Sequence, residues 1–256
     1  MSLQPKKSLG QHFLKDQNIL RKIATVTDAK KGEMVLEIGP GEGALTGHLR
    51  ELYENVKAVE VDGRAIEQLQ TEYPEVNIIH ADILKVSWDE LGLISGKSVV
   101  VGNIPYYITS PILFKIMDAG QLIRRAVLLM QDEVARRITA SPGTKDYGIL
   151  SVQAQVLGTP EYLFPVSRHV FFPKPKVESA VISWEPDSAI DAEDIPLFKR
   201  VVRTAFNQRR KKLSNSLKPV LNGEIEFDLN LRPDQLTPED FITLLNAVKE
   251  SDYNES

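Results

Sequence analysis

Five short apolar segments alternate, in the first half of the chain, with stretches of helical periodicity. The segments are MVLEIG (34–39), VKAVEVD (56–62), VNIIHAD (76–82), SVVVGNI (98–104) and AVLLMQ (126–131). Between them, sequences such as GALTGHLRELYE (43–54) repeat their apolar residues with the period of an α-helix. Buried strands that alternate with helices form a parallel sheet with crossover helices. The pattern therefore predicts an α/β fold with a mainly parallel sheet.

The pattern changes beyond Met130. A helix, a loop and a further helix are followed by two predicted strands, EYLFPVS (161–167) and ESAVISWE (178–185), which would close the sheet as an antiparallel pair. The polar, proline-bounded segment that begins at Pro186 leads into a region that is helical to its end. We predict a first domain over residues 1–186 and a smaller helical domain over residues 187–256.

Residues that are missing from the chain exclude several kinds of chemistry. Cysteine is absent, which rules out disulfides, thiolate zinc sites, iron–sulfur clusters and cysteine nucleophiles. The four histidines have no metal-ligand spacing, so we predict no metal. No apolar stretch approaches the roughly 20 residues of a membrane span, and the first residues lack the apolar core of a signal peptide. We expect a cytoplasmic protein.

A glycine-rich turn follows the first predicted strand. Gly39, Gly41 and Ala44 match a dinucleotide-binding fingerprint, and Glu60 stands where a ribose-binding acid is expected. Free N–H groups at the start of the next helix favour an anionic or polar ligand. The turn alone fits a nicotinamide dinucleotide, S-adenosylmethionine or a tight turn without a ligand.

Three carboxylates favour S-adenosylmethionine. Glu37, Glu60 and Asp82 lie at or near the carboxyl ends of successive strands, where open α/β sheets bind ligands. Glu37 would repel a pyrophosphate but attract an ammonium or sulfonium group. Asp82 could accept a hydrogen bond from an adenine amino group. Each acid alone could be a helix cap or a solvated charge, but the three together predict this cofactor.

The segment NIPYY (103–107) reaches the same edge of the sheet. Pro105 holds Ile104 extended, so that the Ile104 carbonyl and the Asn103 side-chain oxygen face one point. Both could accept hydrogen bonds from an adenine 6-amino group, which favours a pyramidal nitrogen whose lone pair can attack. Tyr106 offers a face on which an extruded base can stack. A motif this short could also simply end a strand, but the neighbouring cofactor site favours catalysis.

Two further segments could contact nucleic acid. In FFPKPKV (171–177), alternating prolines predict a stiff loop that presents Phe171, although such a residue more often belongs to a core. The net charge of −4 hides a stretch without acids from Lys199 to Lys218. Its densest part is Arg209, Arg210, Lys211 and Lys212. A solvated helix face is the usual role of such a run, but the missing acids favour phosphate contacts.

Ordered motifs give the chain a specific resemblance. SLGQHFL, EIGPGEG, VEVD, HADIL, GNIPYYITSPI, DYGILSVQAQ, VFFPKPKVESAVI and AFNQRRKKLSNSL occur in the order seen in the rRNA adenine dimethyltransferases. The chain most resembles their bacterial small-subunit branch. The resemblance implies a class I, Rossmann-like methyltransferase fold with a seven-stranded sheet, followed by a small helical domain that binds RNA. It also implies transfer of methyl groups from S-adenosyl-L-methionine to two adjacent adenines in a 3′-terminal hairpin of 16S rRNA, within the immature 30S subunit.

The same resemblance implies roles for single residues. Those expected at the cofactor are Gln11, His12 and Leu14, which would close over it, Gly39 and Gly41 at its methionine portion, Glu60 at its ribose, and Asp82 with Ile83 at its adenine. Asn103 would touch both cofactor and target, and Phe171 would stack on the target base opposite Tyr106. Position 12 is often asparagine in the family, so a backbone contact is the firmer expectation for His12.

Three alternatives remain. The large-subunit rRNA methyltransferases that confer macrolide resistance share these motifs, but FNQRRKKLSNSL (206–217) and the acidic helical tail favour the small-subunit branch. DNA adenine and protein glutamine methyltransferases more typically carry a second proline where Ile104 stands. A ribosome-assembly factor for which methylation is secondary is the alternative from a different class. We expect a monomer.

Overall fold

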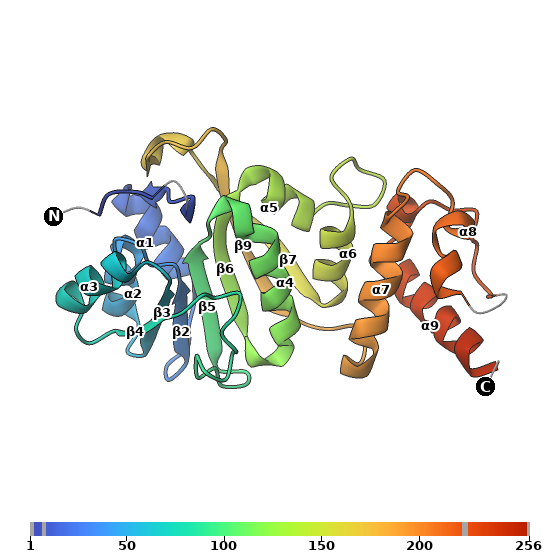
Figure 1. Ribbon diagram of the computed structural model, residues 1–256, viewed down its shortest axis with the longest axis horizontal. Helices are drawn as coiled ribbons and strands as arrows, with labels where there is room; N and C mark the ends of the chain where they lie inside the picture. Colours follow the sequence, from blue (N-terminus) through green and yellow to red (C-terminus); the bar gives the residue numbers. More distant parts are fainter. Residues whose placement is uncertain (1–2, 7–8, 222–224, 255–256) are drawn as a thin grey trace. The chain divides into compact units, whose positions relative to one another are not determined.

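A seven-stranded sheet organises the computed structural model, which describes residues 3–6, 9–221 and 225–254 (Figure 1). In spatial order the strands are β4 (Asn77–His80), β3 (Val56–Glu60), β2 (Met34–Ile38), β5 (Ser98–Asn103), β6 (Arg125–Gln131), β9 (Ser179–Pro186) and β7 (Gly158–Val166). The first five pair in parallel, and β9 is antiparallel to β6. The predicted α/β fold and its mainly parallel sheet are confirmed.

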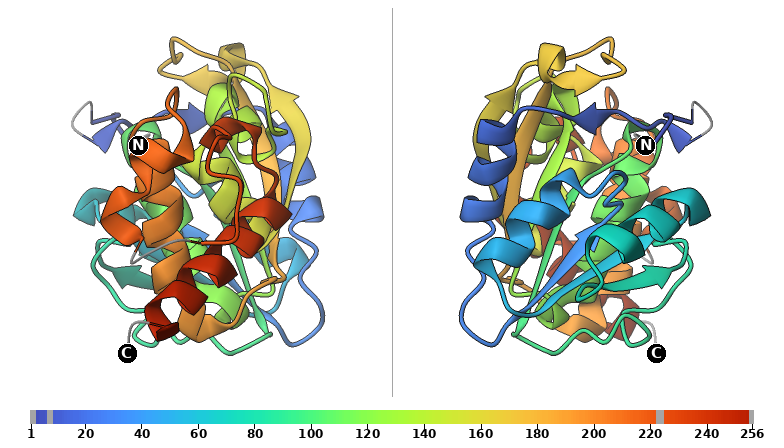
Figure 2. Two further views of the ribbon diagram at one scale, coloured as in Figure 1. Left: turned by 90° about the vertical axis from the view of Figure 1, so that its right-hand side faces the viewer. Right: turned by 90° about the vertical axis from the view of Figure 1, so that its left-hand side faces the viewer.

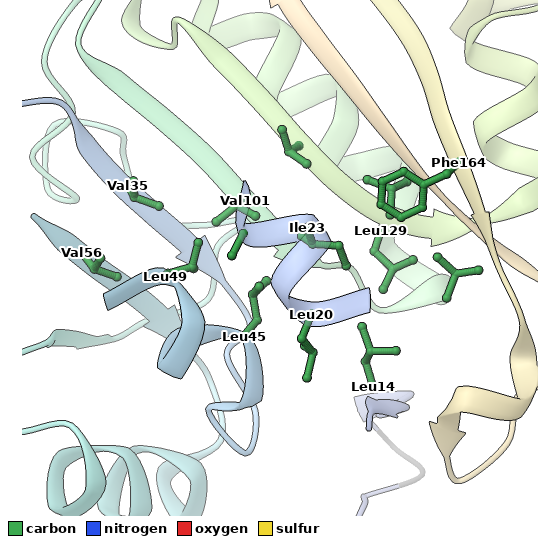
Figure 3. Packing of buried hydrophobic residues seen from close by; sticks show 14 of the residues in the cluster. Leu14, Leu20, Ile23, Val35, Leu45, Leu49, Val56, Val101, Leu129 and Phe164 are labelled. Carbon is green, nitrogen blue, oxygen red and sulfur yellow. The ribbon is translucent and has the colours of Figure 1, made fainter. Parts of the chain in front are cut away.

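The central strands are apolar without alternation because helices cover them. The burial pattern is continuous in β2, and α1 (Gln17–Val26) packs beside α2 (Ala44–Leu52) on one face of the sheet (Figure 2). Leu20 and Ile23 of α1 join Leu45 of α2 in a core cluster over these strands (Figure 3).

Local capping sets the helix boundaries near the carboxyl ends of the strands. Asp16 accepts hydrogen bonds from two backbone N–H groups at the start of α1, and Asp62 does the same once for α3 (Gly63–Glu72). Gly43, before α2, has a φ of +81°, and a Cβ there would lie 2.5 Å from Tyr73. Helix α4 (Thr109–Ala119) begins directly after the NIPYY segment.

A separate antiparallel pair joins segments that are far apart in the sequence. Strand β1 (Phe13–Leu14) pairs with β8 (Phe171–Phe172), so that Phe13 lies opposite Phe172 and Leu14 opposite Phe171. The N–H of Lys15 extends the pairing by donating to the Val170 carbonyl at 2.8 Å. This pair, which the sequence did not predict, brings the N-terminal segment next to the FFPKPKV loop.

The chain divides into two compact units. The first comprises Met1–Ala135 and Glu161–Pro186, and the second comprises Arg136–Pro160 and Asp187–Ser256, with α5 (Asp132–Ile138) crossing a border. The predicted boundary at Pro186 coincides with one border. Residues 136–160, which were assigned to the first domain, instead group with the C-terminal segment, because α6 (Ile149–Val156) packs against α7 (Ile195–Phe206) and α9 (Pro238–Asn254).

Aromatic side chains form the core of the second unit. Phe206 stacks on Phe241 with ring centroids 5.9 Å apart and meets the Tyr147 ring edge-on at 6.4 Å. Tyr147 comes from the segment before α6, so this contact helps to explain why residues 136–160 belong here. The short helix α8 (Leu213–Ser216) follows the basic run. Throughout the described residues, every helix is too short or too polar to cross a membrane.

Candidate active site

A cavity of about 410 Å³ opens at the carboxyl ends of β2 to β5. Gly39 follows β2, Glu60 ends β3, Asp82 follows β4 and Asn103 ends β5, and all four line the cavity. The predicted residues that line it are Gln11, His12, Gly39, Gly41, Glu60, Asp82, Ile83, Asn103, Ile104, Pro105 and Tyr106. The expected meeting of the strand ends at one site is therefore found in the fold.

Glu60 holds the glycine turn against the end of β3. One carboxylate oxygen accepts from the Gly41 N–H at 3.1 Å, and the other accepts from the N–H groups of Val61 and Asp62 at 2.8 and 2.9 Å. Its side chain is buried, yet it reaches the cavity. The turn can approach a ligand closely because Gly41 has a φ of +55° and no side chain.

The amide of Asn103 is oriented by the N-terminal segment. Its Nδ2 donates to the His12 carbonyl at 2.9 Å, which leaves Oδ1 as the acceptor at the cavity. The N–H of Ile104 donates to the Leu129 carbonyl at 2.9 Å and ties the segment to β6. Pro105 stays extended with ψ of 131°, and the helical turn begins only at Tyr106. The arrangement can present a fixed oxygen to an amino group.

His12 connects three parts of the site. Its Nδ1 lies 2.7 Å from the Pro173 carbonyl, and because a carbonyl can only accept, Nδ1 carries the proton. The ring stacks on Tyr106 with centroids 5.4 Å apart. The Tyr106 hydroxyl is hydrogen-bonded to Ser179 at 2.6 Å, and burial raises the pKa of Tyr106. The backbone contact expected between His12 and the cofactor stays a prediction, and the contacts of the His12 side chain were not predicted.

Three predicted residues do not line the cavity. Leu14 and Phe171 face each other across the β1–β8 pair, and both belong to the buried core cluster. Glu37 is buried, and its carboxylate accepts from the Thr46 hydroxyl at 2.6 Å. The Phe171 side chain is therefore buried in the core cluster in this structure. The roles assigned to these three residues stay predictions.

Glu37 gives the stability of the ligand-free protein a pH dependence. Burial raises the pKa of its carboxyl to about 8 from an ordinary 4.5. Between these values the folded protein keeps the group neutral while the unfolded chain ionises it. The contribution of Glu37 to the free energy of unfolding is therefore fully present below about pH 4.5 and is lost as the pH rises to about 8.

We expect the free energy of unfolding in urea to fall between pH 5 and pH 8 by on the order of a few kcal/mol more in the wild type than in Glu37→Gln. Glutamine keeps an acceptor for Thr46 but cannot ionise. Equal pH dependence in the two proteins would show that Glu37 is already ionised when buried.

A polar clamp around Asp62 was not predicted from the sequence. Its carboxylate accepts hydrogen bonds from Lys6 at 3.1 Å, Gln11 at 3.4 Å and Arg64 at 2.6 Å. The hydrogen bond from Arg64 lowers the pKa of the Asp62 carboxyl. Lys6 and Gln11 belong to the N-terminal segment, so this clamp holds that segment beside the cavity. The only sequence signal was Asp62 as a helix cap in VEVD.

The four basic residues of the second unit differ in their contacts. Arg209 donates to the Thr144 carbonyl at 3.0 Å and lies 3.7 Å from the Asp234 carboxylate. Lys212 donates to the Asn230 side chain at 3.0 Å. Arg210 and Lys211 are exposed. The run therefore combines one residue that braces the unit, Arg209, with three exposed residues, of which Lys212 also contacts Asn230.

Comparisons with known proteins agree with one another. The profile of the family described as ribosomal RNA adenine dimethylase matches residues 2–248. The ribosomal RNA small subunit methyltransferase A of Chlorobaculum parvum is 48% identical over 250 residues, which cover 97% of this chain and 91% of that protein. The protein of the same name from Bacteroides thetaiotaomicron is 46% identical, with coverage of 97% and 96%.

Two solved structures are similar over nearly the whole chain. A dimethyladenosine transferase from Plasmodium falciparum has a TM-score of 0.81 and 26% identity, with coverage of 94% of this chain and 98% of that one. The 23S rRNA methyltransferase ErmE has a TM-score of 0.70 and 25% identity, with coverage of 93% and 99%. These similarities confirm the predicted methyltransferase fold.

Proposed function

This chain belongs to the ribosomal RNA adenine dimethylase family, and we propose that it dimethylates N6 of two adjacent adenines in a 3′-terminal hairpin of small-subunit rRNA. The observation that carries the proposal is the Asn103 amide, which the His12 carbonyl holds at the edge of the cavity with Oδ1 left to accept. The relatives named as small-subunit rRNA methyltransferases are 48% and 46% identical to this chain, and this similarity supports small-subunit rRNA as the substrate over large-subunit rRNA.

The enzyme depends on S-adenosyl-L-methionine, and the cavity suits that molecule. Backbone N–H groups and glycines at the first turn can approach its methionine portion, and the buried Glu60 carboxylate can accept from ribose hydroxyls. Asp82 and Ile83 line the part of the cavity after β4, where an adenine ring can lie. When bound, the cofactor supplies an electrophilic methyl group and leaves as a neutral thioether.

The residues of the chain make the adenine N6 a better nucleophile. In free adenine the N6 lone pair is delocalised into the ring. Asn103 Oδ1 and the Ile104 carbonyl can draw the two N–H hydrogens out of the ring plane and leave the lone pair for attack. Because both acceptors are held before the base arrives, little reorganisation is needed in the transition state. Tyr106 supports the base by stacking, and one N6 proton is lost to solvent after each transfer.

We propose the immature 30S subunit in the cytoplasm as the physiological substrate, with residues 187–256 contributing RNA contacts. Every residue that lines the cavity lies in the first unit, and we propose that the protein acts as a monomer. The test is transfer of labelled methyl groups to purified small subunits, large subunits and DNA that lack the modification. Label confined to small subunits supports the proposal, and label confined to large subunits or DNA would refute it.

Arg210 and Lys211 are expected to contact phosphates, whereas Arg209 stabilises the second unit. Replacing both Arg210 and Lys211 with alanine should weaken subunit binding and reduce its salt dependence by about one unit of slope per lost contact. Arg209→Ala should instead lower the free energy of unfolding by about 1 kcal/mol. Lys97→Ala is the control for the loss of one positive charge elsewhere on the surface, since this exposed lysine precedes β5 at the end away from the cavity. An unchanged salt slope in the double variant would contradict the assignment.

A further inference from the structure

Phe172 is an exposed aromatic residue that the catalytic arrangement does not use. Its exposed fraction is 57%, whereas its neighbour Phe171 is 5% exposed. Residues directly opposite each other in an antiparallel pair project from the same face. Phe172 lies opposite Phe13, which lines the cavity, and Phe171 lies opposite Leu14, which is in the core. The Phe172 ring therefore stands on the cavity side of the β1–β8 pair.

Basic residues surround this ring along its own segment. Exposed His169, Lys174 and Lys176 flank Phe172 in RHVFFPKPK, and the Lys174 ammonium lies 3.3 Å from the His169 ring. The acid that follows this segment, Glu178, is paired with Arg168 at 3.3 Å. An exposed ring between cations is the arrangement by which proteins bind unpaired nucleic acid, through base stacking and phosphate contacts.

The segment is held in place before any ligand binds. Arg168 donates its backbone N–H to Glu178 at 2.8 Å and its guanidinium to the Lys176 carbonyl at 3.1 Å. At the other end, the Pro173 carbonyl accepts from His12 at 2.7 Å. A ring on a braced loop loses little conformational freedom on binding, which favours a stacking role.

The position of His12 separates Phe172 from the target adenine. The His12 ring stacks on Tyr106 and is bonded to Pro173, so it lies between the Tyr106 ring and the loop. Phe172, one residue before Pro173, is therefore not the partner of Tyr106 on the target base. A base extruded from a hairpin leaves its neighbour in the strand unstacked on one side. That neighbouring base is the ligand that the exposed ring of Phe172, paired with a residue of the cavity lining, can accept.

We propose that Phe172 is the stacking platform for the unpaired base next to the adenine held at Asn103, with Lys174 and Lys176 at the adjoining phosphates. This inference rests on the proposed function, because it requires an RNA strand with an extruded adenine. It assigns to Phe172 a contact with a second nucleotide, which determines how the strand is positioned rather than how the methyl group is transferred.

Steady-state transfer to purified small subunits tests the proposal. Phe172→Ala should raise KM for the subunit roughly 5- to 100-fold, the usual effect of removing one stacking ring, with kcat within about threefold of the wild type. Phe172→Trp should restore KM. Val177→Ala is the matched control, because Val177 is a 43% exposed apolar residue of the same loop. Cofactor binding and Tm should be unchanged in all three variants.

Each outcome is decisive. An unchanged KM in Phe172→Ala overturns the inference, and so does failure of Phe172→Trp to restore it. A fall in kcat of more than about tenfold would place the ring at the target base and overturn the assignment to its neighbour. If the wild type transfers no methyl groups to small subunits, the proposed function fails instead, which distinguishes the two failures.

Discussion

Asn103→Ala is expected to lower kcat for methyl transfer by about 100- to 1000-fold, the usual effect of removing one preorganised hydrogen-bonding group that acts in the transition state. Small-subunit binding should stay within about threefold, because the basic residues of the second unit and the Phe172 segment are untouched. The measurements are single-turnover transfer and filter binding of small subunits at the same salt concentration.

The control for this prediction separates the two ends of the amide. Asn103→Asp keeps an oxygen for the N6 amino group but loses the Nδ2 donor that the His12 carbonyl accepts from. We expect Asn103→Asp to retain more activity than Asn103→Ala, because the side-chain oxygen acts on the N6 nitrogen, whereas the hydrogen bond from Nδ2 to the His12 carbonyl only orients the side chain. Equal loss of transfer and subunit binding in Asn103→Ala would show that the residue serves binding rather than chemistry.

Glu60→Ala is expected to weaken cofactor binding by about 10- to 150-fold. A hydrogen bond to a charged partner contributes about 1.5–3 kcal/mol, and this carboxylate is placed to accept from the ribose. The substitution also leaves the N–H groups of Gly41, Val61 and Asp62 without their partner, so the turn itself should loosen. Titration calorimetry with S-adenosylmethionine measures the first effect, and Tm without cofactor measures the second.

A second variant, Glu60→Gln, removes the charge of Glu60 but keeps the size of its side chain, and Glu42→Gln is its matched control. Glu42 lies on the same glycine turn but pairs with Lys15, and it is not among the residues that line the cavity. We expect Glu42→Gln to bind the cofactor like the wild type and Glu60→Gln to bind it distinctly more weakly. Wild-type affinity for the cofactor in Glu60→Gln would show that the Glu60 carboxylate does not bind the ribose.

The strands that form the site were predictable because their local pattern and their burial agree. The central residues of segments such as SVVVGNI are apolar without alternation, since both faces of the sheet are covered, and this pattern excludes most other folds. Parallel strands then bring their carboxyl ends to one edge by topology alone, which is why Glu60, Asp82 and Asn103 could be placed together without coordinates.

Features that depend on contacts between distant segments could not be predicted. Two adjacent phenylalanines on a strand project to opposite faces, and only the pairing with Phe13 and Leu14 decides that Phe172 is exposed and Phe171 buried. Helix α6 is apolar, which predicts burial but not the partner, so its packing against α7 and α9 was missed. From the sequence alone, the Glu37 side chain could face a ligand or α2, and in the structure it accepts a hydrogen bond from the Thr46 hydroxyl of α2.

Mapping the methylated nucleotides shows whether this enzyme dimethylates N6 of two adjacent adenines in small-subunit rRNA. Unmodified small subunits are incubated with the enzyme and S-adenosylmethionine, and the rRNA is digested and examined by mass spectrometry. We expect N6,N6-dimethyladenosine at two neighbouring positions of the 3′-terminal hairpin with the wild-type enzyme, and no dimethyladenosine with the Asn103→Ala variant. Methyl groups at another atom, at a single adenine, or only on large-subunit rRNA would contradict this expectation.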